Sequence, residues 1–189
     1  TCTAIKANEV CTLLWKEINM KKMTSLLAFL TLAILAGTFS GCGKTEAQKV
    51  EALDIPLTKK RVLVECAKKN FVEAQKKVNE MCGYTVPIEV DWKSLAVYDD
   101  SYTKVTRVQN YGFNPILEGI AALTKDDMGK KALAAKLKKI VIAGKDPKKS
   151  GNMKEDLWFK DGTLFTRQAI DGNGYYSGDR VKELLEKNL

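Results

Sequence analysis

The sequence LWFKDGTLFT at residues 157–166 predicts a two-residue β-hairpin. Two runs of apolar and β-branched residues flank Asp161-Gly162, a pair that readily takes the positive φ angles of a type I′ turn. This is the strongest local signal in the chain, so the fold contains at least one antiparallel pair of strands. Further strands and a covering layer of helices must come from the residues before and after it.

Two more strands are predicted upstream of the hairpin. Residues 87–92 alternate apolar and acidic side chains, which is typical of a half-buried strand. The apolar run from Ile140 to Ala143 predicts a short buried strand. Residues 102–109 leave two alternatives open, because their β-branched side chains suit a short strand but the segment otherwise belongs to a loop of about twenty residues.

Helices are predicted from apolar residues at steps of three or four. The longest covers residues 58–82 and stops at Gly83; its apolar stripe consists of Leu63, Ala67, Phe71, Ala74, Val78 and Met81. Three shorter helices are also predicted. One begins at Asn114-Pro115, a second follows an N-cap within residues 124–127 and runs to about Lys138, and a third covers residues 179–187. The expected fold is α+β, with a helix layer on a small, mainly antiparallel sheet.

Cys66 and Cys82 give conflicting signals. An exported protein favours a disulfide between them. In a continuous helix their Cα atoms lie about 24 Å apart, far beyond the roughly 4.4–6.8 Å that a disulfide spans. We favour the helix with two unpaired thiols, because six apolar positions support its stripe.

Composition excludes several kinds of chemistry. The chain has 189 residues and no histidine, so it cannot form a Ser-His-Asp or Cys-His nucleophile or a histidine-bearing zinc site. Residues 171–182 resemble an EF-hand loop, but Tyr176 and Lys182 occupy the positions that require glycine and glutamate. We therefore expect neither a metal nor a cofactor, and no catalytic residue is assigned.

An export signal precedes the predicted domain. Lys21 and Lys22 are followed by the apolar run 26–36 and then by small residues up to Cys42, the three parts of a secretory signal peptide. The segment Phe39-Ser40-Gly41-Cys42 resembles the lipobox of bacterial lipoproteins, although that family usually has Leu, Val or Ile where Phe39 stands. The resemblance implies cleavage before Cys42 and lipidation of its thiol, so that the protein is attached to the membrane.

This interpretation divides the chain into four parts. Residues 1–19 are predicted to be a read-through leader that is not native, because Lys16-Glu17 can be encoded by a purine-rich ribosome-binding sequence suitably spaced for translation to start at Met20. Residues 20–41 are the signal peptide, 42–56 a lipidated tether and 57–189 the domain. The alternatives are a genuine cytoplasmic extension and an uncleaved signal anchor. Either way the domain is extracytoplasmic, and Gly43, where many lipoproteins of the inner membrane have aspartate, favours the outer membrane.

Aromatic and basic side chains cluster between residues 92 and 113. The candidate binding residues are Trp92, Tyr98, Tyr102, Arg107 and Tyr111. Rings beside cations suit an envelope protein, a glycan or an anionic lipid headgroup, and nucleic acid is not expected outside the cytoplasm. Packing in the core is the alternative. We predict a lipid-anchored bacterial envelope protein that acts as a non-enzymatic binding or scaffolding module; the alternative is a small envelope hydrolase that uses paired carboxylates.

Overall fold

The structure is a computed structural model that describes residues 43–146, 156–171 and 176–189. From Lys44 onward these residues form one compact unit. The predicted leader, the signal peptide and Cys42 lie outside the described residues. Within the described ranges, no helix combines the length and the hydropathy needed to cross a membrane.

Four strands form one sheet in the order β1-β2-β4-β3. Their bounds are Ile88–Asp91 for β1, Lys139–Gly144 for β2, Leu157–Lys160 for β3 and Thr163–Gln168 for β4. β2 runs parallel to both β1 and β4, and only the β3–β4 pair is antiparallel. The α+β class is confirmed, but the sheet is mostly parallel, not mainly antiparallel. The reason is that helices connect β1 to β2 and return the chain to the same end of the sheet.

The predicted hairpin is confirmed. Asp161 and Gly162 have φ angles of 51° and 81°, so both turn residues take the positive φ that a type I′ turn requires. The turn aligns Lys160 with Thr163 and Trp158 with Phe165. A two-residue turn of this kind determines the register of both strands from local sequence alone.

The helix predicted over residues 58–82 forms, with a π-helical turn in its middle. It consists of α3 (Leu57–Cys66), η1 (Ala67–Phe71) and α4 (Val72–Cys82), and it ends at Gly83, whose φ is 77°. Asn70 and Cys82 are buried where Phe71 and Met81 were expected, because the wider π turn changes which side chains face the sheet. Cys66 and Cys82 are both free and buried, as the helix predicts.

Residues 92–123 form helices, with turns at residues 96–104, and contain no strand. A short turn α5 (Trp92–Leu95) precedes α6 (Val105–Arg107), η2 (Val108–Phe113) and α7 (Asn114–Leu123), which follow one another directly. The β-branched residues near 105 suited a strand, but Val108, Phe113, Ile116 and Ile120 bury one helical face against the core. The π turn η2 lies just before Pro115, which has no N–H to donate to a preceding carbonyl.

The remaining helices are α2 (Glu46–Glu51), α8 (Asp127–Lys136) and α10 (Gly178–Asn188). The N-cap of α8 is Asp126, whose side chain accepts from the amide of Gly129. α2 lies in the stretch expected to be a tether. A capping box between Thr45 and Gln48 starts this helix, and Val50 is fully buried. The folded unit therefore includes residues that composition alone assigned to a linker.

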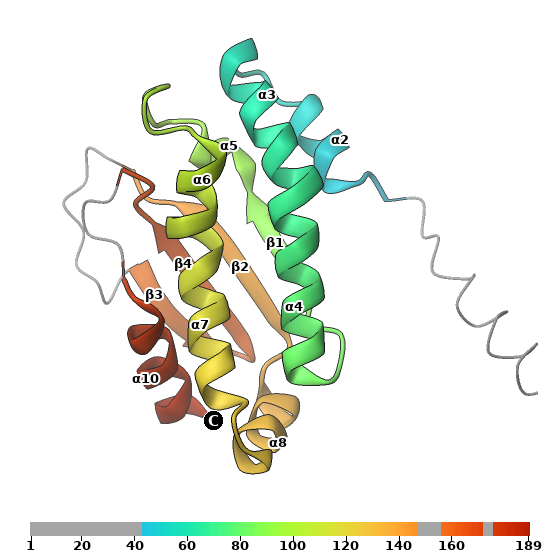
Figure 1. Ribbon diagram of the computed structural model, residues 1–189, viewed down its shortest axis with the longest axis vertical. Coiled ribbons are helices and arrows are strands. Elements are labelled where there is room, and N and C mark those ends of the chain that lie inside the picture. Colours follow the sequence, from blue (N-terminus) through green and yellow to red (C-terminus); the bar gives the residue numbers. More distant parts are fainter. Residues whose placement is uncertain (1–42, 147–155, 172–175) are drawn as a thin grey trace, which may run out of the picture. The chain divides into compact units, whose positions relative to one another are not determined.

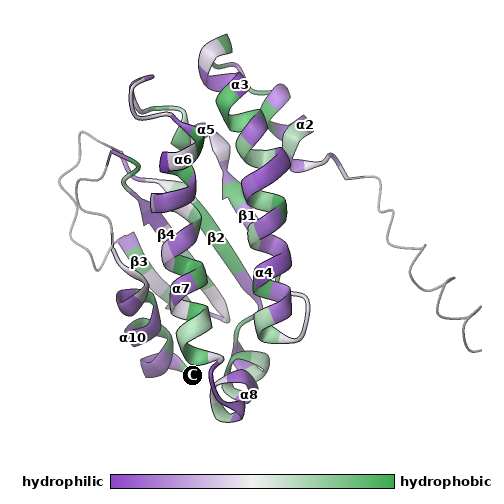
Figure 2. Cartoon of the chain, in the orientation of Figure 1, coloured by the Kyte–Doolittle hydropathy of each residue, from purple (hydrophilic) through white to green (hydrophobic). Residues whose placement is uncertain are grey.

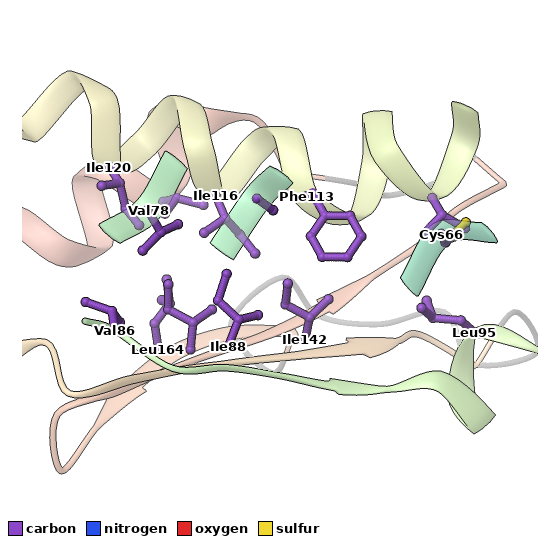
Figure 3. Close-up of a cluster of buried hydrophobic side chains, with 14 of the residues drawn as sticks. Cys66, Val78, Val86, Ile88, Leu95, Phe113, Ile116, Ile120, Ile142 and Leu164 are labelled. Carbon is purple, nitrogen blue, oxygen red and sulfur yellow. The ribbon is translucent and has the colours of Figure 1, made fainter. Parts of the chain in front are cut away.

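The helices α4, α7 and α10 lie in front of the sheet and cover one of its faces (Figure 1). α10 is largely hydrophilic on its visible side, α4 and α7 carry both hydrophilic and hydrophobic residues, and β2 behind them is hydrophobic (Figure 2). In the core, Ile88, Ile142 and Leu164 project from the sheet toward Val78, Phe113, Ile116 and Ile120 of the helices (Figure 3). This layer fixes the ends of the strands, and the candidate site lies at those ends.

Candidate functional site

The three parallel strands end at the same edge of the sheet, which we call the carboxyl edge. It consists of the residues that follow β1, β2 and β4, starting at Trp92, Lys145 and Ala169. In open sheets with parallel strands, ligands bind beyond the carboxyl ends of the strands. All five candidate binding residues lie along this edge or contact it.

Tyr98 joins the ends of two strands. Its side chain is buried, and its hydroxyl donates to the carbonyl oxygens of Lys145 and Gln168, the latter at 3.2 Å. The amide of Lys145 donates to the same Gln168 oxygen at 2.9 Å. Burial, with a smaller contribution from the charge of Asp171, raises the pKa of Tyr98 well above its ordinary value. The hydroxyl is therefore engaged inside the protein.

Arg107 is held between two tyrosines. Its guanidinium carbon lies 5.1 Å from the ring centroid of Tyr102 and 5.9 Å from that of Tyr111. Nη1 donates to the carbonyl oxygens of Asp171 at 3.0 Å and Ile170 at 3.4 Å, just after β4. Cation–π contacts and main-chain hydrogen bonds together fix the charge in one place. Such a group is pre-organised to meet an acceptor, because little side-chain entropy remains to be lost on binding.

Trp92 ties α2 to the end of β1. The indole Nε1 donates to Oε2 of Glu46 at 2.8 Å, and the ring meets Phe71 edge to face at 6.5 Å. Only 3% of Trp92 is exposed. Its contacts within the protein account for its position.

The five predicted residues thus differ in what they offer a ligand. Trp92 and Tyr98 are buried and bonded within the protein, whereas Tyr102, Arg107 and Tyr111 are half-buried. The structure brings these last three together at the carboxyl edge. Binding through this group stays a prediction.

Two further groups at this edge were not singled out from the sequence. Lys145 and Asp156 form an ion pair at 2.7 Å with both side chains nearly buried, and the hydroxyl of Tyr176 donates to the carbonyl of Asp156 at 3.1 Å. Burial raises the pKa of Tyr176 well above its usual range. The available signal was weak: Lys145 directly follows β2 and Asp156 directly precedes β3, but their proximity depends on how the strands are arranged in the sheet.

Gln168 is the second missed residue. It is the last residue of β4 and is fully buried, yet neither Oε1 nor Nε2 of its amide has a hydrogen-bond partner among the described residues. An unpaired buried polar group costs roughly 1–3 kcal/mol. Such an amide offers one acceptor and two donors to any polar group that reaches it.

Two acidic side chains line one groove but are directed to different neighbours. Glu80 and Glu118 both line a groove of about 370 Å³ between α4 and α7. Glu80 lies 3.7 Å from the Lys76 ammonium, while a Cβ added at Gly178 would lie 2.9 Å from Oε2 of Glu118, so that carboxylate is directed toward α10. Among the described residues, no group of three or more Cys, Asp and Glu side chains is placed to hold a metal ion.

Comparison of the chain with protein-family models, with curated proteins and with solved structures found no match.

Proposed function

We propose that this protein is a lipid-anchored protein of the bacterial envelope, and that its domain is a non-enzymatic module that binds another envelope component at the carboxyl edge. The observation that carries the binding role is the Arg107 guanidinium, fixed between Tyr102 and Tyr111 beside the end of β4. A charge held in this way suits the recognition of an anionic or carbonyl-rich partner.

The position of the folded unit supports the anchoring. The compact unit begins at Lys44, two positions after the cysteine of the lipobox-like segment. Cleavage before Cys42 would remove residues outside this unit and leave its core unchanged. The lipid on Cys42 would then attach a domain that starts almost directly at the membrane surface.

The anchoring is tested by intact-mass analysis of the membrane fraction from cells that express the full chain. We expect a polypeptide that begins at Cys42 and carries acyl chains. Cys42→Ser removes the thiol and should abolish both processing and acylation, whereas Ser40→Ala keeps a small residue and should be processed normally. A soluble product that retains Met20 would refute the proposal.

The binding chemistry centres on one fixed cation. Arg107 supplies charge-assisted donors beside the end of β4. Gln168 is fully buried at the end of that strand, so its amide lies inside the protein. Envelope glycans, anionic headgroups and peptide carbonyls all carry matching acceptors. The alternative, a hydrolase with paired carboxylates, gains no support from the groove between α4 and α7, because the Glu118 carboxylate is directed toward α10 and Glu80 toward Lys76.

The binding role is tested by co-sedimentation of the processed chain with purified peptidoglycan and with phosphatidylglycerol vesicles. Arg107→Gln should weaken binding to the recognised probe about tenfold, since a hydrogen bond to a charged group contributes about 1.5–3 kcal/mol. Arg180→Gln is the matched control, because Arg180 is an exposed residue of α10 that pairs with Glu183. If neither probe binds, or if both variants bind alike, the proposed role of Arg107 is wrong.

A further inference from the structure

The face of the sheet opposite the helices, which we call the open face, has its own apolar centre. Alternate residues of each strand point into the core, among them Ile88, Ile142 and Leu164. Val141, Phe165 and Trp158 are the intervening residues. They lie in one cross-strand row, are half-buried, and do not belong to the core cluster.

This apolar row is rigid. The rings of Trp158 and Phe165 stack at 4.9 Å with only 5° between their planes. The guanidinium carbon of Arg167 lies 5.1 Å from the Trp158 ring. Tryptophan and arginine dominate the binding energy of many protein interfaces, and rings already locked in one rotamer lose little entropy when covered. The open face is therefore composed like the centre of a protein–protein interface.

Charge on the open face is divided between its two sides. Glu89 and Asp91 project from β1 at one side, and Lys160 and Arg167 project from β3 and β4 at the other; all four residues are exposed. Lys139 of β2 pairs with Glu89 at 2.7 Å within the acidic side. An acidic border, an apolar centre and a basic border thus follow one another across the strands.

We propose that two copies of this chain associate through their open faces, about a two-fold axis parallel to the strands. That axis places β1 of each copy over β3 of the other, because the strand order is β1-β2-β4-β3. Acidic borders then face basic borders, and Val141 faces Phe165 at the centre. A two-fold axis perpendicular to the strands would instead place β1 over β1, so that like charges would meet. The charge pattern thus specifies both the partner and its orientation.

The same axis leaves both chains attached at the same end of the pair. A rotation about the strand direction keeps the carboxyl ends of β1, β2 and β4 of both copies at the same end of the pair. Glu46, near the start of the folded unit, accepts a hydrogen bond from Trp92 at the carboxyl end of β1. The folded unit of each copy therefore starts at that end of the pair. Two anchors in one membrane require this arrangement, and this step alone rests on the proposed anchoring.

The association is tested by density-matched sedimentation equilibrium of the full chain in a mild detergent. Wild-type protein should have the mass of a dimer, and the mass should persist when more detergent distributes the chains among more micelles. Full-chain Cys42→Ser should give the same result, so a failure of anchoring is distinguishable from a failure of pairing. A wild-type monomer at the highest soluble concentration overturns the inference.

Charge reversal tests the orientation. Glu89→Lys/Asp91→Lys and Lys160→Glu/Arg167→Glu should each be monomeric alone, and an equimolar mixture of the two should form a dimer. Lys130→Glu/Lys131→Glu on α8, away from the open face, should stay dimeric. Circular dichroism should confirm that each variant is folded before its mass is measured by sedimentation equilibrium. A mixture of folded variants that stays monomeric, or reversed variants that still pair alone, would contradict the two-fold arrangement.

Discussion

Two glutamines, the half-buried Gln75 and the fully buried Gln168, show what a side-chain amide does in this fold with and without partners. Gln75 on α4 is fully engaged: Nε2 donates to the carbonyl of Val86 at 2.6 Å, and Oε1 accepts from the amide of Ile88 at 2.9 Å. These bonds connect the helix to the start of β1. Gln168 is more deeply buried, and its amide has no such partner among the described residues.

We predict opposite effects for the same substitution at these two positions. Gln168→Met removes an unpaired amide and keeps the length of the side chain, so the free energy of unfolding should rise by about 1–2 kcal/mol. Gln75→Met removes three hydrogen bonds, to Val86, Ile88 and Asn79, and should lower it by about 1–3 kcal/mol. Urea denaturation measures both. Destabilisation by Gln168→Met would show that the native protein satisfies this amide in solution.

The two thiols make stability depend on alkaline pH. Burial raises the pKa of Cys66 to about 12 and that of Cys82 to about 11, from 9.0 in the absence of burial. Folding therefore favours the protonated thiol. Its stabilising effect is complete below pH 9 and is lost as the pH rises through 9 toward 11–12, because the unfolded chain releases these protons first.

We expect both thiols to resist a thiolate-specific reagent such as Ellman's reagent at pH 8 in the native protein. In urea both should react, because unfolding restores exposure and the ordinary pKa. In a chain that starts at Lys44, which contains only Cys66 and Cys82, Cys82→Ala should leave one thiol to react on unfolding, which counts the sites. Rapid reaction of the native chain would mean that the helix carrying these thiols opens readily.

The site residues differ in how far sequence predicts them. The cluster at 92–111 was found because its rings and cations are neighbours in sequence. Lys145, Asp156 and Gln168 were missed, since they meet only when β2 and β4 lie side by side and parallel. Composition also does not distinguish Trp92, which is buried, from Arg107, which is half-buried.

Helices α7 and α10 approach each other closely at two glycines. A Cβ at Gly119 would lie 2.6 Å from Cβ of Val181 and 2.9 Å from the carbonyl oxygen of Gly178. One of these atoms belongs to the backbone and the other is the Cβ of a branched side chain. Neither can move away without a shift of the α10 backbone. This crossing therefore depends on the absence of a side chain.

We predict that Gly119→Ala lowers the free energy of unfolding by about 1–3 kcal/mol, because the added methyl must separate the two helices. Gly112→Ala is the matched control. There the nearest atom is Cγ1 of Val108 at 3.8 Å, and alanine should be neutral or stabilising by up to about 1 kcal/mol. Thermal unfolding of both variants checks this. Equal effects would show that helix propensity, and not close packing, decides the outcome.

Elements set by local chemistry were predicted, and those set by distant contacts were not. The Asp161-Gly162 turn and the Gly83 helix stop depend on the φ angles of one or two residues. The direction of β2 beside β1 depends on the whole helical connection between them, which periodicity does not reveal. The strand considered near residue 105 failed for the same reason, because tertiary burial of Val108 and Phe113 overrode β-propensity.

At the scale of the molecule, the folded unit depends on its first helix. We predict that a chain starting at Leu57 is less stable than one starting at Lys44 by about 3 kcal/mol, since it loses the burial of Val50 and the bond from Trp92 to Glu46. Urea denaturation of the two chains provides the comparison. Equal stability would show that α2 does not stabilise the folded unit, and would support the interpretation of residues 42–56 as a tether.

The position of β4 links the architecture to the order in which the chain is made. β4 lies between β2 and β3 and bonds to both, yet it occupies residues 163–168 of 189. A nascent polypeptide that ends before Thr163 leaves β2 without its second neighbour. The sheet is therefore completed only after the residues up to Gln168 have been synthesised. If the domain is exported as proposed, this late completion would keep the chain unfolded while it crosses a narrow translocation channel.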